Sequence, residues 1–237
     1  MSDSKRRLPT PAAADKAVAD FIEGLKTVPV LRPVGKKGRL LFALDATMSR
    51  EPTWEAAREI QSEMFREAGK VGGLLIQLAC FRGQGEFFAS PWLEDAATLA
   101  EAMSLVDCRG GRTQLRRVLE HALAEVGRER ISAIVYIGDC FEERGKVACD
   151  LAGKIALNGV PIFVFHEGAE VYAGRLFKEI ARITRGAYCP FDKGSAKQLA
   201  ELLRAVAVYA AGGRTALVDH AARAGGSALL IAHQIGL

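Results

Sequence analysis

The sequence predicts an α/β protein with a doubly wound, mostly parallel central sheet, one short antiparallel strand, and helices on both faces. Two observations predict this class. Short, continuous apolar runs recur along the chain, and such runs are typical of strands that are buried on both faces. Segments with helical periodicity separate them, and this alternation indicates βαβ units around a parallel sheet. The apolar runs cover residues 40–44, 73–81, 133–137 and 161–165.

The first 37 residues are expected to form an extension outside this fold. A short helix is predicted over 12–26, and Pro29 and Pro33 end it because proline interrupts a helix. Residues 1–40 hold nine Lys or Arg and four Asp or Glu, whereas the whole chain has a net charge of +4. The basic charge therefore belongs to the extension, which we expect to be solvated.

The remaining elements are expected to form one domain over residues 38–212. A turn at Gly83 to Gly85 predicts that the short strand 86–89 is antiparallel to the strand before it. Gly186 is expected to cap a helix. The Ala-rich end, 213–237, is left open between a docked helix and a loose tail. The predicted helices span 53–68, 96–105, 113–126, 143–157, 171–184 and 196–211, and 187–190 is a weak edge strand.

Composition excludes several functional classes. No stretch approaches the roughly 18 uncharged apolar residues of a spanning helix. The start of the chain is polar and basic, so we expect neither a secretory signal nor a membrane association. The five cysteines are an odd number without paired spacing, which predicts reduced thiols in a cytoplasmic protein. Outside the extension no basic stripe with interleaved aromatic residues occurs, which disfavours nucleic-acid binding.

Oxygen-bearing side chains follow two of the predicted strands. Asp45, Thr47 and Ser49 alternate after the first strand, and Asp139 follows the strand 133–137. Thr113 stands at the start of a predicted helix between them. Ligands of doubly wound sheets bind at the carboxyl ends of the strands, so these side chains are expected to meet there. Hard oxygen donors with few charges suit Mg²⁺, with Mn²⁺ or Ca²⁺ as alternatives, and no Cys or His cluster has zinc spacing.

This set of residues resembles the metal-ion-dependent adhesion site of von Willebrand factor A domains. That motif is Asp-x-Ser-x-Ser after the first strand, a distant threonine, and an aspartate after a later strand. Here the resemblance covers residues 38–212, with Thr47 in place of the first serine and Cys140 where a glycine is common. The corresponding metal-binding residues are Asp45, Thr47, Ser49, Thr113 and Asp139.

The resemblance implies a role for each of these side chains. The hydroxyls of Thr47 and Ser49 would bind the ion directly, and that of Thr113 would do so in one state. Asp45 and Asp139 would act largely through water or hydrogen bonds. The sixth position would take a carboxylate from a protein partner. The resemblance therefore predicts an intracellular docking domain without catalytic residues, of the kind that serves in assemblies with AAA+ ATPases or chaperone-like machines. The Ala-, Arg- and Gly-rich composition suggests a bacterial protein.

Two other functions remain as alternatives. A haloacid-dehalogenase-like phosphohydrolase would use Asp45 as nucleophile and the acidic segment 138–143 to hold Mg²⁺. However, Thr47 stands where its general acid belongs, and no lysine for clamping phosphate occurs between Lys70 and Lys146. The second alternative is a scaffold that keeps the loop shapes and binds no metal.

Each candidate residue also has a purely structural interpretation. Asp45 and Asp139 taken singly would cap helices, and Thr113 would be an N-cap. His166 is expected to be a satisfied structural histidine, and Cys140 an inert thiol because no histidine is near it in sequence. The pair at 142–143 is expected to be the solvated start of a helix.

Overall fold

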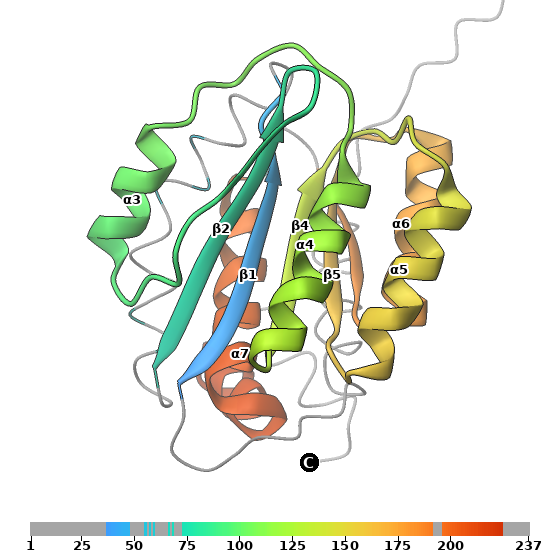
Figure 1. Ribbon diagram of the computed structural model, residues 1–237. Helices are drawn as coiled ribbons and strands as arrows, with labels where there is room; N and C mark the ends of the chain where they lie inside the picture. Colours follow the sequence, from blue (N-terminus) through green and yellow to red (C-terminus); the bar gives the residue numbers. More distant parts are fainter. Residues whose placement is uncertain are drawn as a thin grey trace, which may run out of the picture.

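The computed structural model describes residues 37–47, 73–191 and 196–224, together with five single positions between residues 55 and 68. Its centre is a six-stranded sheet with the strand order β3-β2-β1-β4-β5-β6 (Figure 1). All neighbouring strands pair in parallel except β2 and β3, which are antiparallel. The predicted fold class is therefore confirmed. The strands are β1 (Gly38–Asp45), β2 (Leu74–Arg82), β3 (Glu86–Ala89), β4 (Ala133–Gly138), β5 (Ile162–Glu167) and β6 (Tyr188–Phe191).

Burial explains why the apolar runs form the middle of the sheet. Every residue of β1, β4 and β5 is buried. The edge strands β3 and β6 alternate between exposed and more buried positions, as a strand with one solvated side does. Hydrophobic burial on both faces of the central strands is the main driving force for this arrangement.

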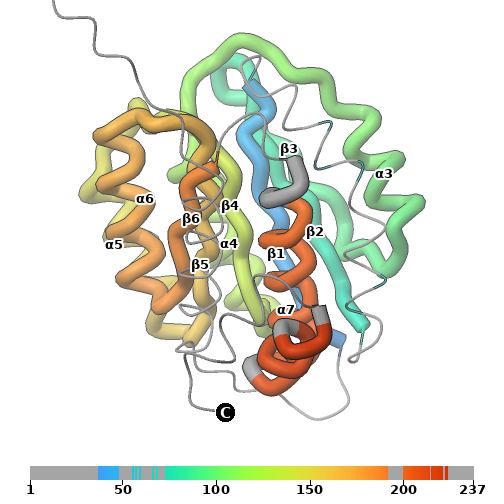
Figure 2. The backbone as a smooth tube through the Cα atoms, turned by 180° about the vertical axis from the view of Figure 1, so that it is seen from behind, coloured from blue at the N-terminus to red at the C-terminus, as the bar shows by residue number. Residues whose placement is uncertain are grey.

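Helices cover both faces of the sheet (Figures 1 and 2). One apolar cluster joins β1, β4 and β5 to α4, α5 and α6, and a second joins the other face of the strands to α3 and α7. Ala57 and Ala68, described within the predicted helix 53–68, are helical and belong to the second cluster. The rest of that helix, and the predicted helix 12–26, lie outside the described residues. The described helices are α3 (Ala96–Ser104), α4 (Leu115–Arg128), α5 (Gly145–Leu157), α6 (Val171–Ile183) and α7 (Ala196–Ala224).

Helix α7 continues past the predicted domain end at residue 212. Gly213 interrupts it with φ 76° and ψ −165°, a backbone conformation that favours glycine. Beyond this kink Leu217 is 1% exposed and belongs to the same core cluster as β1. The chain up to Ala224 is therefore a helix that packs on the domain, and residues 225–237 lie outside the described part.

The end of α6 differs from the prediction that Gly186 caps it. Thr184 is the C-cap, and Arg185 takes the left-handed conformation with φ 54°. The Gly186 N–H donates to the Ala181 carbonyl at 2.9 Å, as in a Schellman ending. Glycine is required at 186 for another reason, since a Cβ there would lie 1.9 Å from the carbonyl oxygen of Ile162.

This geometry predicts opposite effects for two neighbouring substitutions. Arg185→Gly should raise the free energy of unfolding by about 0.5–1 kcal/mol, because it relieves the left-handed strain of a residue with a Cβ. Gly186→Ala should lower it by more than about 2 kcal/mol, because the backbone of β5 must shift. Urea denaturation of both variants measures the two changes. Equal effects of the two substitutions would contradict this description of the turn.

A buried ion pair lies at the opposite end of the sheet from the aspartates. Arg39 near the start of β1 and Glu125 on α4 are 6% and 3% exposed. Their Nη2 and Oε2 atoms are 3.6 Å apart, and Trp92 Nε1–H donates to the same Glu125 oxygen at 2.7 Å. The Arg39 guanidinium lies 3.9 Å from the centre of the Trp92 ring. This cluster ties α4 to β1 and to the segment after β3.

Candidate metal site

The two candidate aspartates lie at the carboxyl ends of adjacent parallel strands. Asp45 is the last residue of β1, and Asp139 follows the last residue of β4. The register pairs Leu44 with Ile137, so both strands end at the same edge of the sheet, uppermost in Figure 1. Asp45 is 2% exposed. Two carboxylates thus come from chain segments about a hundred residues apart, as the strand pattern predicts.

A tight turn shapes the loop after β1. The Thr47 N–H donates to Oδ1 of Asp45 at 2.8 Å, so Asp45 caps its own turn. Backbone hydrogen bonds from Ala46 to Phe81 and from Arg109 to Ala46 fix the loop against β2 and the α3–α4 connection. The Thr47 side chain is buried, with 7% exposed. Ser49, the third member of the predicted loop set, lies outside the described residues.

Thr113 joins this edge from the α3–α4 connection. It is 4% exposed, and its hydroxyl donates to the carbonyl oxygen of Cys140 at 3.2 Å. Helix α4 begins at Leu115 with Gln114 as its N-cap, so the N-cap interpretation of Thr113 is wrong. The Thr113 hydroxyl instead contacts the loop that carries Asp139.

The acidic pair after β4 is not the solvated start of a helix, because α5 begins only at Gly145. Oε2 of Glu142 accepts from the Thr113 N–H at 3.3 Å. Oε2 of Glu143 accepts from the Arg116 N–H at 3.2 Å. Carboxylates at a helix N-terminus satisfy donors that have no partner within the helix. The two side chains therefore hold the start of α4 and Thr113 against the Asp139 loop.

His166 supports the same loop from the end of β5. It is 1% exposed, and its Nε2 lies 3.0 Å from the carbonyl oxygen of Asp139. Because a carbonyl only accepts, Nε2 carries the proton, and Nδ1 accepts from the Tyr188 hydroxyl at 2.8 Å. Burial raises the pKa of Tyr188 to about 12, so this hydroxyl keeps its proton in neutral solution. His166 is thus a hydrogen-bonded structural histidine that positions the backbone of Asp139.

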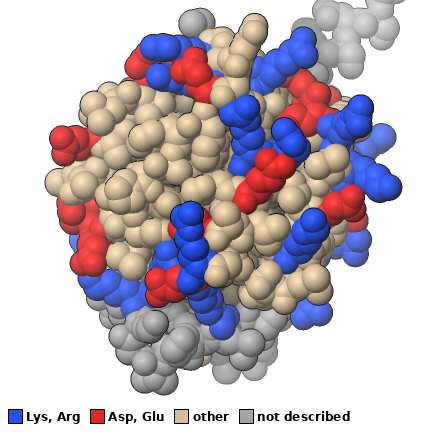
Figure 3. Space-filling view, viewed as in Figure 1, with Lys and Arg blue, Asp and Glu red and all other residues tan. Residues whose placement is uncertain are grey.

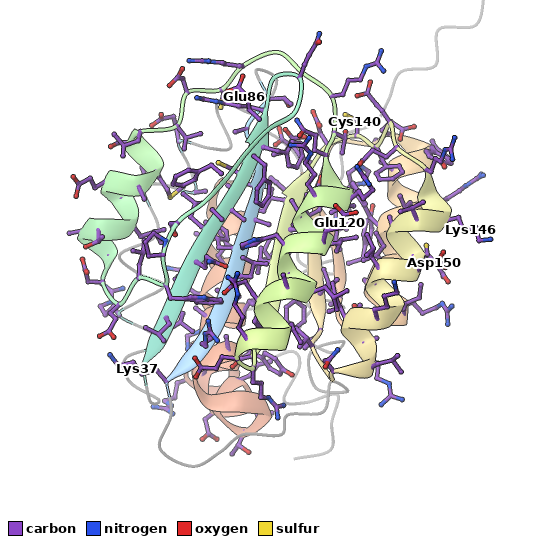
Figure 4. The ribbon with its side chains drawn as sticks, viewed as in Figure 1. Lys37, Glu86, Glu120, Cys140, Lys146 and Asp150 are labelled. Carbon is purple, nitrogen blue, oxygen red and sulfur yellow. The ribbon has the colours of Figure 1, made fainter. Side chains whose placement is uncertain are left out.

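Cys140 lies at the centre of this arrangement, at the upper edge of the sheet in Figure 4. Burial is the main cause that raises the pKa of its thiol to about 12, and the charges of Asp139 and Asp45 add to this effect. The thiol stays protonated at neutral pH and is a poor nucleophile, as predicted.

The site thus combines two carboxylates and two buried hydroxyls from three chain segments. Among the residues that the structure describes, no three His, Cys, Asp or Glu side chains form a metal-binding cluster. A cation here would therefore depend on the hydroxyls of Thr47 and Thr113 as well as on Asp45 and Asp139. Such a hard, weakly charged donor set fits Mg²⁺ better than zinc. Whether these side chains bind a cation together stays a prediction, and Ser49 lies outside the described residues.

No protein-family model and no curated protein sequence matches the chain. Solved structures do resemble it. A von Willebrand factor type A protein from Catenulispora acidiphila matches at a TM-score of 0.55 and 15% identity, over 75% of this chain and 43% of that one. The SpRpn10 VWA domain matches at a TM-score of 0.55 and 14% identity, over 72% of this chain and 95% of that one.

A third match is proximal thread matrix protein 1 from the mussel byssus, in a structure with a zinc-occupied metal-ion-dependent adhesion site. It has a TM-score of 0.58 and 13% identity, over 73% of this chain and 46% of that one. The chain thus spans less than half of two of these proteins and almost the whole of the isolated SpRpn10 domain. At such low sequence identity, the similarity to these structures concerns the backbone fold alone. The strand order and these matches together show that the chain has the fold of a von Willebrand factor A domain.

Proposed function

We propose that the protein binds Mg²⁺ through Asp45, Thr47, Ser49, Thr113 and Asp139, and that it docks an acidic protein partner through this site. The observation that carries the proposal is that Asp45, Thr113 and the Asp139 loop meet at one edge of the sheet. A protein of the same fold has such a site occupied by zinc, which supports a divalent cation.

The hydroxyls of Thr47, Ser49 and Thr113 would hold the cation directly, and the two carboxylates would hold its water ligands. The bound cation would supply positive charge that attracts a partner's carboxylate. The hydrogen bonds of His166, Glu142 and Glu143 orient the loops around it. Residues that hydrogen-bond to the metal ligands, without touching the metal, also contribute to metal affinity.

The proposed setting is an intracellular assembly of a bacterium, with an AAA+ ATPase or a chaperone-like machine as the partner class. All five cysteines are free, which supports a reducing environment. None of the helices in the described part of the chain has both the length and the apolar character needed to cross a bilayer. The matching structures named above include von Willebrand factor A domains, which supports a docking role over the phosphohydrolase alternative.

A calorimetric titration of Mg²⁺ into chelator-treated protein tests the proposal. We expect one saturable site in the native chain and an affinity about 10-fold lower in Thr113→Val, which keeps the shape and removes one ligand oxygen. Thr98→Val on α3 is the matched control and should leave the affinity unchanged. The absence of saturable binding by Mg²⁺, Mn²⁺ and Ca²⁺ would show that the domain is a metal-free scaffold.

A further inference from the structure

A cavity of about 460 Å³ lies beside the candidate metal site, between the β2–β3 turn and the start of α4. Arginines 112, 116 and 117 line it together with Gln114 and Glu143. Arg112 and Gln114 flank Thr113 in the chain, so this arginine pocket adjoins the proposed metal site. Figure 3 shows basic side chains gathered on this face near the same end of α4.

Two of the three guanidinium groups have no acidic partner in the described part of the chain. Arg116 pairs with Glu120, with Nη1 and Oε1 3.2 Å apart. Arg117 donates from Nη1 to the backbone carbonyl of Gly85, and no described carboxylate lies within ion-pair distance of Arg117 or Arg112. All three side chains are exposed. The pocket therefore carries positive charge that the domain does not itself neutralise.

The walls of the pocket are held in place by contacts between distant segments. A Cβ on Gly111 would lie 2.1 Å from the carbonyl oxygen of Gly83, so the two loops touch through their backbones. Nε2 of Gln114 donates to the carbonyl of Arg82 at 3.1 Å. Together with the bond between Arg117 and Gly85, these contacts hold the loop backbone and the Arg117 side chain against the β2–β3 turn. A preorganised site of this kind loses little conformational entropy when it binds a ligand.

The pocket also offers hydrogen-bond acceptors. Gln114 is 8% exposed, and its Oε1 is buried without a hydrogen-bond partner among the described residues. The Glu143 carboxylate forms part of the lining. An acceptor without a donor is costly when buried, so a shift of the Gln114 side chain that lets Oε1 accept from a ligand N–H group would be favourable. A phosphodiester backbone has no such donor, whereas a peptide carries backbone N–H groups beside its acidic side chains.

From this lining we propose that the pocket binds a second acidic side chain of the docked partner, whose first carboxylate sits on the cation. The partner segment is then an acidic peptide: its carboxylate pairs with Arg112 and Arg117, and its backbone N–H groups face the acceptors. Arginine suits this task because its planar guanidinium binds a carboxylate in a bidentate manner. This inference depends on the proposed function only for the binding of the partner's first carboxylate to the cation.

The test uses a fluorescein-labelled peptide, Gly-Asp-Gly-Glu-Glu-Gly, and its neutral analogue, in which Asn and Gln replace Asp and Glu. Fluorescence anisotropy with excess Mg²⁺ should show tighter binding of the acidic peptide. The double variant Arg112→Ala/Arg117→Ala should weaken this binding at least about 10-fold, as expected for two charged hydrogen-bonded contacts. Arg175→Ala/Arg182→Ala on α6 removes the same charge elsewhere and should change it less than about 2-fold.

Two further measurements separate this inference from the proposed function. Calorimetry should show that the arginine double variant binds Mg²⁺ as well as the native chain does. The double variant should also weaken peptide binding when a chelator replaces Mg²⁺. The single variant Arg112→Ala, which loses no contact that the structure shows, reports on the pocket if the double variant is unstable.

Three results would overturn the inference. The first is equal affinity for the acidic peptide in the native chain and both pocket variants, even if Mg²⁺ binds as proposed. The second is an equal loss in the α6 control, which would indicate general electrostatic attraction. The third is stronger binding of inorganic phosphate or of a short single-stranded oligonucleotide than of the peptide. If peptide binding depends on the arginines but its affinity is the same with and without Mg²⁺, the result would instead support the pocket and contradict the metal-based function.

Discussion

Replacing Glu125 by glutamine should lower the free energy of unfolding by about 3 kcal/mol, the range found when one member of a buried ion pair is removed. The substitution keeps the shape of the side chain and removes its charge. Within the described part of the chain, Arg39, which is 6% exposed, then keeps Glu129 alone as an acidic partner, and that side chain is 53% exposed. The hydrogen bond from Trp92 also becomes weaker, because its acceptor is no longer ionised.

The matched control is Glu120→Gln on the same helix. Glu120 forms an exposed i,i+4 pair with Arg116, and such pairs contribute little. Glu120 precedes Glu125 on α4 and therefore lies nearer to the start of the helix, on the side of Cys140 (Figure 4). Urea denaturation should give a change below about 0.5 kcal/mol for this variant. A similar small change for Glu125→Gln would mean that the buried cluster does not stabilise the fold.

The pH dependence gives a second readout for Glu125. Burial alone would raise its pKa, but hydrogen bonds from Trp92 and Arg128 outweigh burial and hold the pKa below the ordinary value of 4.5. A carboxyl with a lowered folded-state pKa stabilises the fold above its unfolded pKa and loses this contribution as the pH falls. The difference in stability between the native chain and Glu125→Gln should therefore shrink on acidification below about pH 4.5. A constant difference would contradict this assignment.

The sheet could be predicted because its signal is local. Each central strand is buried on both faces, so each is a continuous apolar run, and parallel neighbours then follow from the helices between them. The same logic places Asp45 and Asp139 at one edge, since both directly follow such runs.

The starts of α4 and α5 could not be predicted, because contacts between distant segments determine them. Glu142 and Glu143 read as helix-forming residues, but they accept hydrogen bonds from Thr113 and Arg116. The periodicity of apolar residues cannot show that the carboxylates of one loop accept hydrogen bonds from the backbone N–H groups of another. The role of His166 depends likewise on Tyr188 and Asp139, although its place at a strand end next to β4 is a usable signal.

The arginine pocket could not be predicted for a related reason. In the sequence, Arg112 and Arg117 are only charged residues near the start of a predicted helix. Their common environment arises because Gly111 lets its loop approach Gly83 closely, and no side chain could occupy that space. A glycine pair that permits a backbone contact leaves no pattern in hydrophobicity or charge.

Asp45→Asn should abolish the stabilisation that Mg²⁺ gives the native protein. At a concentration 100 times its dissociation constant, a ligand that binds only the folded state raises the free energy of unfolding by about 2.7 kcal/mol. Asparagine still offers an Oδ1 that accepts the Thr47 N–H, so the turn after β1 is kept. The variant loses one of the two carboxylates near the cation, which should lower Mg²⁺ affinity by about 100-fold.

Without Mg²⁺ the variant should be at least as stable as the native chain, because a buried carboxylate near a second one is costly. This expectation separates loss of the metal site from a general defect in folding. Asp150→Asn is the matched control, since this exposed residue lies on α5, away from Cys140 in Figure 4. Thermal unfolding with and without Mg²⁺ measures both effects. An equal rise in melting temperature for all three proteins would place the cation elsewhere, because a charge removed at the end of β1 would then have no influence on it.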